Sequence, residues 1–89
     1  MKQVYNYWMP DTDNHFYRMI TKRISQGGPA EYQDDVRDAA YNYVTDFDIA
    51  LDIGANVGFW ARPLTKKFKQ VIAYEPMPQV LECLELNIK

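Results

Sequence analysis

The chain has 89 residues, of which 47% are hydrophobic, 25% charged and 15% aromatic, a composition typical of one soluble globular domain. A chain of this length buries only about 60% of the surface that its unfolded form exposes, which excludes two full domains. Lys and Arg number 10 against 12 Asp and Glu, so we expect no basic surface for nucleic acid.

Cysteine, histidine and the apolar runs exclude further classes. The single cysteine, Cys83, cannot form an internal disulfide, and the one histidine, His15, has no partner at ligand spacing. We therefore expect no metal site. The N-terminus lacks the apolar run of a signal peptide, and no stretch reaches the roughly 18 apolar residues of a membrane span. The default expectation is a cytoplasmic protein with no membrane partner.

Residues 1–47 are rich in aromatic side chains and are predicted to form a helical cover. An amphipathic pattern at helical spacing predicts a first helix that begins after Pro10 and ends at Gly27. Pro29 is a favourable first-turn residue for a second helix, whose apolar face continues to Tyr43.

After Phe47 the pattern changes. Residues 49–53 form a continuous apolar run, which is typical of a strand buried on both faces of a parallel sheet. A glycine turn and a helical pattern over residues 57–68 follow. Pro63 is expected to kink this helix, because it removes a backbone donor. A second apolar run predicts another strand over residues 71–75.

A third helical pattern follows Pro78. The order strand, glycine turn, helix, strand, turn, helix predicts a right-handed βαβα unit in residues 48–89. The 17 residues between Ile53 and Val71 suffice for the helical crossover that parallel strands require. The expected fold class is α/β, a partial Rossmann-like unit preceded by two helices in residues 1–47.

The segment from Leu51 to Gly58 carries the features that point to chemistry. Asp52 lies at the carboxyl end of the first strand, and three residues separate Gly54 from Gly58. Gly54 lets the backbone turn tightly and approach a ligand, whereas Gly58 lets the following helix pack closely. Ligands of doubly wound sheets bind at this edge, so the turn predicts a cofactor site.

The glycine spacing discriminates between cofactors. A dinucleotide fingerprint requires a Gly-x-Gly pair, but this chain has Asp-x-Gly-x-x-x-Gly. A Walker phosphate loop requires Lys and Ser or Thr after its last glycine, whereas Phe59 and Trp60 follow Gly58. Both nucleotide-phosphate interpretations are therefore disfavoured.

Glu75 ends the second strand, 23 residues after Asp52. A carboxylate there can accept hydrogen bonds from the vicinal hydroxyls of a ribose, as acids about 20 residues beyond the glycine turn do in dinucleotide sites. A strand-end glutamate by itself is more often only solvated. Its combination with the glycine turn favours a nucleoside ligand.

Three segments, residues 50–58, 71–76 and 84–88, resemble the opening of an S-adenosylmethionine-dependent methyltransferase of the FkbM type. The resemblance implies a class I methyltransferase fold with S-adenosylmethionine as cofactor. Members of this family are generally O-methyltransferases, so it also implies methyl transfer to a hydroxyl of a sugar or small molecule.

The resemblance also assigns cofactor-binding residues. It implies that Glu75 holds the ribose hydroxyls, with Pro76 and Met77 near the adenosine. The residues that would surround the methionine moiety are Asp52, Gly54, Ala55, Asn56 and Gly58. No catalytic base stands out, because His15 is interpreted as a structural or surface residue and Cys83 as a small core residue.

A complete class I sheet has more than two strands, so both strands predicted here should have unpaired edges. We expect the chain to be the N-terminal, cofactor-binding part of a methyltransferase, not competent for catalysis alone. The alternative is a non-catalytic or degenerate S-adenosylmethionine-binding module that self-associates or binds a protein through its sheet edges. A third interpretation is an interaction domain without a ligand. Outside the motif, Trp8, Tyr32 and Arg37 are candidates for a lid.

Overall fold

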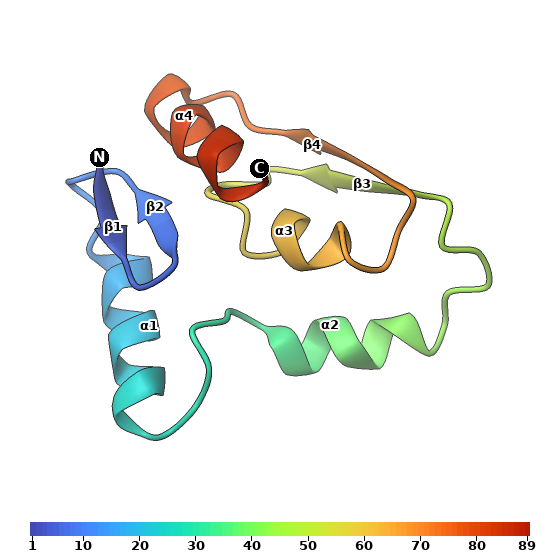
Figure 1. Ribbon diagram of the computed structural model, residues 1–89, viewed down its shortest axis with the longest axis horizontal. Helices are drawn as coiled ribbons and strands as arrows, with labels where there is room; N and C mark the ends of the chain where they lie inside the picture. Colours follow the sequence, from blue (N-terminus) through green and yellow to red (C-terminus); the bar gives the residue numbers. More distant parts are fainter.

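The protein is described by a computed structural model of residues 1–89, a mixed α/β domain with two small sheets and four helices (Figure 1). The α/β class is as predicted. No helix has the length and apolar character needed to span a bilayer. The elements in chain order are β1 (Lys2–Val4), β2 (Tyr7–Met9), α1 (His15–Ser25), α2 (Asp34–Tyr41), β3 (Ile49–Ile53), α3 (Ala61–Leu64), β4 (Gln70–Tyr74) and α4 (Pro78–Asn87).

Strands β3 and β4 form the predicted parallel pair. Ile49 lies opposite Gln70 and Ile53 opposite Tyr74, so the two strands are in register along their whole length. The connection between them contains α3, as a parallel crossover requires. Both strands point toward the N-terminal hairpin and α1, so their carboxyl ends lie beside these elements (Figure 1).

Helices α3 and α4 cover one face of this sheet. The small core on that face consists of Ala55, Ala61 and Leu84, with Val71, Ala73 and Leu81 packed against them. On the opposite face, Leu51 is 62% exposed and Ile53 is 78% exposed. The prediction that residues 49–53 are buried on both faces is therefore wrong. Side chains alternate between the faces of a strand, and only one face has helices to cover it.

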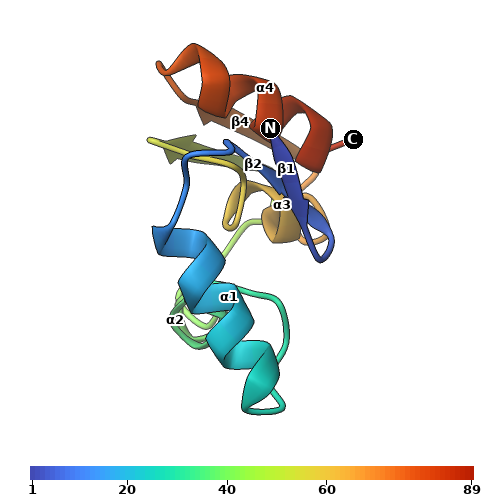
Figure 2. The ribbon, with the colours of Figure 1, turned by 90° about the vertical axis from the view of Figure 1, so that its left-hand side faces the viewer.

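The larger core joins the two halves of the chain. Figure 2 shows the hairpin between α4 and α1. Buried side chains of the hairpin share one core with Ile20 of α1 and Cys83 of α4. Ile20 is buried, with Phe16 and Ile24 packed beside it on the same face of α1. The buried members of this core are Val4, Tyr7, Met9, Ile20, Val57, Phe59 and Cys83. The two predicted segments thus share one core.

The hairpin corrects the prediction that residues 1–47 form only helices. β1 and β2 pair antiparallel with Val4 opposite Tyr7, so Tyr5 and Asn6 make the turn. Tyr5 has a φ of 54°, a left-handed conformation that glycine and asparagine adopt more readily than tyrosine. The sequence therefore lacks the usual glycine of a two-residue hairpin.

Two helix predictions also differ from the structure. α2 begins at Asp34 rather than near Pro29, because Gln33 takes a left-handed φ of 52° and stands outside the helix. The helix predicted over residues 57–68 is only the four-residue α3. Pro63 lies in its first turn, where N–H groups lack helical acceptors, so the predicted kink is wrong. α1 and α4 lie where they were predicted.

A buried amide connects three segments of the fold. Asn87, at the end of α4, is 4% exposed. Its Oδ1 accepts a hydrogen bond from the Trp8 N–H at 2.7 Å. Its Nδ2 donates to the carbonyl oxygens of Trp8 at 2.8 Å and Val57 at 2.6 Å. One side chain thus joins α4, β2 and the loop after β3.

Replacing this amide should destabilise the whole domain. Asn87→Ala leaves an N–H and two carbonyl groups without their partner, so we expect the free energy of unfolding to fall by about 3 kcal/mol. The matched control is Asn42→Ala, because Asn42 is exposed and its side chain makes no hydrogen bond; its effect should stay within about 0.5 kcal/mol. Urea denaturation measures both values, and equal losses would contradict the assigned role.

Candidate functional site

A cavity of about 260 Å³ lies at the carboxyl end of β3. Its lining comes from the loop after β3, from α1 and from the segment before α2. The lining residues are Phe16, Tyr32, Gln33, Asp52, Gly54, Ala55, Asn56, Phe59 and Trp60. Four of the predicted site residues therefore line it, whereas Gly58, Glu75 and Pro76 lie outside its lining.

The loop after β3 is fixed to the end of β4 by its backbone. The N–H groups of Gly54 and Ala55 both donate to the carbonyl oxygen of Tyr74 at 2.9 Å. Gly54 has a φ of 75°, and a Cβ placed on it would meet no atom within 4 Å. The backbone of Gly54 therefore borders open space, as a loop that closely approaches a ligand should.

Glu75 locks this loop in place. Its Oε1 accepts a hydrogen bond from the Asn56 N–H at 2.8 Å, and its Oε2 accepts one from the Met77 N–H at 3.1 Å. Asn56 is held in a left-handed conformation with a φ of 53°. An ionised carboxylate offers about four acceptor positions, so Glu75 keeps about two for a ligand.

Asp52 has an unsatisfied acceptor. Its Oδ2 is buried and has no hydrogen-bond partner. Burial raises the pKa of the Asp52 carboxyl above its ordinary value. Buried carboxylate oxygens are normally paired, so this atom is the place in the cavity where a donor group of a ligand would be most favourable.

Gly58 has a packing role, but not against its own strand. It has a φ of 103°, and a Cβ on it would lie 3.1 Å from Leu84 Cδ1 of α4. Asn87 and Ile88 lie next in distance. The close approach thus brings the loop against α4 rather than into the cavity, and Gly58 supports the site from behind.

Sequence reasoning missed the aromatic wall of the cavity. Phe16 and Tyr32 meet edge to face with ring centroids 5.3 Å apart, and Trp60 Nε1 donates to Gln33 Oε1 at 3.0 Å. Of the three lid candidates, only Tyr32 lines the cavity. The concentration of aromatic residues before residue 48 was the one signal that could have indicated this wall.

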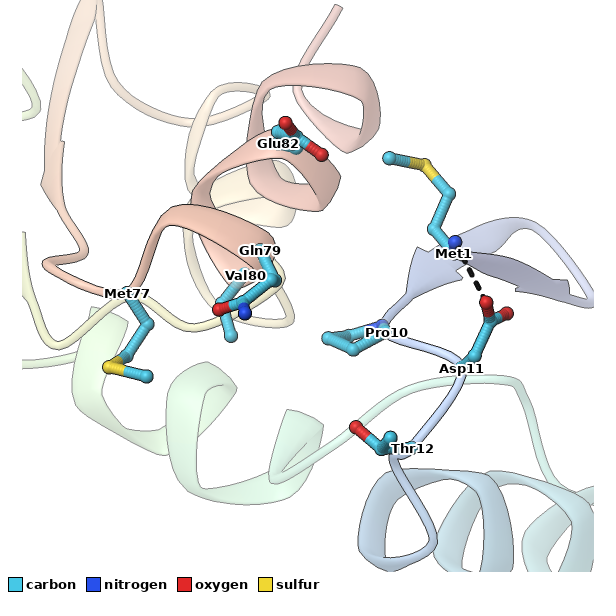
Figure 3. Close-up of a pocket in the computed structure, with 8 residues that line it drawn as sticks. All are labelled: Met1, Pro10, Asp11, Thr12, Met77, Gln79, Val80 and Glu82. Atoms are coloured by element: carbon cyan, nitrogen blue, oxygen red, sulfur yellow. Dashed lines mark hydrogen bonds and ion pairs between the residues drawn. The ribbon is translucent and has the colours of Figure 1, made fainter.

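A larger cavity, of about 510 Å³, lies between the first half of α4 and the N-terminal segment (Figure 3). The residues drawn there are Met1, Pro10, Asp11, Thr12, Met77, Gln79, Val80 and Glu82. Of the residues expected near a cofactor, only Met77 borders it. The smaller cavity is the better candidate site, because it gathers the acid, the glycine turn and the aromatic wall.

The two remaining chemistry-bearing residues lie outside the candidate site. His15 is exposed at the first position of α1. Cys83 is fully buried in the larger core, as its interpretation as a core residue predicted, and burial raises the pKa of its thiol.

Comparisons with family models, curated proteins and solved structures find no match to the chain. Functional inference therefore depends on the chemistry of the cavity.

The raised pKa of Asp52 makes a prediction for stability. Because its native pKa is raised, the Asp52 carboxyl binds a proton more tightly in the native state than in the unfolded state, whose carboxyl pKa is about 4. Asp52 therefore contributes favourably to the free energy of unfolding at low pH. This contribution is lost as pH rises through the native pKa. Asp52→Asn should remove that loss and stabilise the domain by about 1 kcal/mol at pH 7.

Urea denaturation between pH 4 and pH 7 measures the effect. Asp48→Asn is the matched control, since Asp48 is exposed and directly precedes β3. The idea is wrong if both variants change the pH dependence of stability equally.

The two loop glycines should respond differently to alanine. Gly58→Ala combines a left-handed backbone with a close contact to the buried Leu84, so it should cost about 2–3 kcal/mol. Gly54→Ala meets no atom and should cost only about 1 kcal/mol of backbone strain. Thermal and urea unfolding measure the two losses. A larger loss for Gly54→Ala would contradict the packing role of Gly58.

Proposed function

We propose that the chain binds S-adenosylmethionine at the carboxyl ends of β3 and β4, as the cofactor-binding part of a Rossmann-like methyltransferase of the FkbM type. One observation carries the proposal. The glycine turn is hydrogen-bonded to the Tyr74 carbonyl and the Glu75 carboxylate at the end of β4, and Asp52 lines the cavity beside this turn. Separate strand-end polar residues without a ligand would not need this arrangement.

The methionine moiety suits the smaller cavity. A volume of about 260 Å³ is just below the range of about 300–1,000 Å³ that holds whole ligands, so the cavity fits part of the cofactor. The unpaired Asp52 Oδ2 is a suitable acceptor for the ammonium group of that moiety. Tyr32 and Trp60 line the cavity, and the face of an aromatic ring attracts a nearby cation such as the sulfonium.

The nucleoside moiety would continue toward Glu75. The two acceptor positions that remain on the Glu75 carboxylate suit the vicinal hydroxyls of a ribose. Pro76 and Met77 are exposed next to it, and Met77 borders the larger cavity, so an adenosine at this point would contact apolar side chains.

When bound, S-adenosylmethionine supplies an electrophilic methyl group, which a sugar or small-molecule hydroxyl would accept if the family resemblance holds. The part of the chain in such a reaction is to orient the cofactor and to exclude water with its aromatic wall. No residue of the cavity is assigned here as a catalytic base.

A module that binds the cofactor without catalysis is the second candidate. The uncovered face of β3 and the unpaired edges of the β3–β4 sheet favour it, because such surfaces are normally covered by further protein. Both candidates require the same binding site.

Calorimetric titration with S-adenosylmethionine tests the site. Glu75→Ala removes the ribose acceptors and should weaken binding by about 1–3 kcal/mol, or roughly 5- to 150-fold. Glu85→Ala is the matched control, because Glu85 is exposed and its side chain makes no hydrogen bond; it should bind within about twofold of the wild type.

Glu75 also holds the loop, so the folded state of each variant needs checking by thermal unfolding. Glu75→Gln keeps one acceptor oxygen and should bind with intermediate affinity. Absence of heat and of a thermal shift at millimolar S-adenosylmethionine would reject the proposed function.

A further inference from the structure

The segment before α2 contributes Gln33 to the lining of the smaller cavity. Gln33 has a left-handed φ of 52°, a strained conformation for a residue with a side chain. α1 fixes the chain on both sides of it, because Arg23 Nη1 donates to the Glu31 carbonyl oxygen at 3.0 Å and the guanidinium pairs with the Asp34 carboxylate. The fold thus holds Gln33 at the cavity despite the backbone strain.

Trp60 orients the side-chain amide of Gln33. An indole N–H can only donate, so the atom that it meets at 3.0 Å is the amide oxygen, Oε1. Nε2 is then the free end of the amide, and it donates to no group of the protein. Gln33 is exposed, so two N–H donors of one side chain are available at the rim of the cavity.

The glycine turn has no backbone N–H group left for an anion. The N–H groups of residues 54–58 all have acceptors within the protein. These acceptors are the Tyr74 carbonyl for the first two, the Glu75 carboxylate for the third, and atoms of the loop itself for the last two. An anionic group beside this turn therefore needs a donor from another part of the cavity.

The methionine moiety of S-adenosylmethionine brings such a group, because its ammonium and carboxylate are attached to the same carbon. The ammonium suits the unpaired Asp52 Oδ2, and Gln33 lines the same cavity with a free donor. We propose, on the basis of the function proposed above, that Gln33 Nε2 binds the α-carboxylate of the methionine moiety. Gln33 then selects ligands that carry this carboxylate.

Two other side chains of the cavity lining have free donors, the Asn56 amide and the Tyr32 hydroxyl. Asn56 lies toward the ribose end of the site, since its backbone N–H bonds the Glu75 carboxylate. The amino-acid group is the end of the cofactor that is furthest from the adenosine. Tyr32 offers one donor, whereas the Gln33 amide offers two. Gln33 is therefore the better partner for the carboxylate.

Calorimetric titration with two ligands tests this role. The ligands are S-adenosylhomocysteine and its carboxamide, which differ only at the carboxyl group and both lack the sulfonium charge. A hydrogen bond to a charged group is stronger than one to a neutral group, so the wild type should bind S-adenosylhomocysteine about tenfold more tightly than the carboxamide.

Gln33→Glu should reverse this preference. The new carboxylate still accepts from Trp60 Nε1, whereas its other oxygen repels the ligand carboxylate and accepts from the carboxamide. We expect S-adenosylhomocysteine to bind at least about tenfold more weakly and the carboxamide to stay within about threefold. Gln70→Glu is the matched control and should keep the wild-type preference, because Gln70 is exposed at the amino end of β4, away from the cavity.

Gln33→Ala gives a second measurement, since it removes the donor without adding charge. S-adenosylhomocysteine should then bind about as tightly as the carboxamide, and thermal unfolding confirms that each variant is folded.

The role of Gln33 is wrong if the wild type binds S-adenosylhomocysteine and both Gln33 variants keep the wild-type preference. It is also wrong if Asn56→Asp reverses the preference, or Tyr32→Phe removes it, while the Gln33 variants do not. These results would leave the proposed cofactor site standing. Absence of binding of S-adenosylmethionine and of both test ligands to the wild type would reject the proposed function, and the role of Gln33 with it.

Discussion

The side-chain amide of Asn87 is the contact on which the arrangement of the chain depends. It lies at the end of α4 and bonds both backbone groups of Trp8 and the carbonyl of Val57. Because these groups are distant in sequence, no local preference could bring them together. The amide therefore sets the hairpin against the loop after β3, and α1 and its aromatic residues reach the carboxyl ends of the strands.

The candidate site follows from that arrangement. The loop after β3 is held from three directions: by the Tyr74 carbonyl, by the Glu75 carboxylate and by the close approach of Gly58 to α4. Gly54, unlike Gly58, borders open space. The residues of the motif thus divide into those that line the cavity and those that hold the loop. Glu75 belongs to the second group, and a carboxylate that makes two hydrogen bonds still has acceptor positions free.

A mostly apolar groove of about 410 Å³ between α2 and β3 lies next to the cavity. Asp52 and Trp60 line both hollows, so the two spaces share side chains. Arg37 and Asp52, the residues with an unsatisfied buried side-chain atom, line these two neighbouring spaces. Buried polar groups without partners destabilise a fold. Both such atoms of this domain belong to residues on the same side of β3.

Patterns within short segments were sufficient to predict the strands at 49–53 and near 71–75, the helices α1 and α4, the tight turn at Gly54 and the strand-end position of Glu75. Each of these features depends on residues that are close in sequence. The signals are the periodicity of apolar residues, the helix-capping residues and the conformational preference of glycine. The hairpin, the uncovered face of β3 and the wall formed by Phe16 and Tyr32 could not be predicted in the same way. They arise from contacts across the chain, because the pairing partner or covering helix of a segment is decided only when the core assembles.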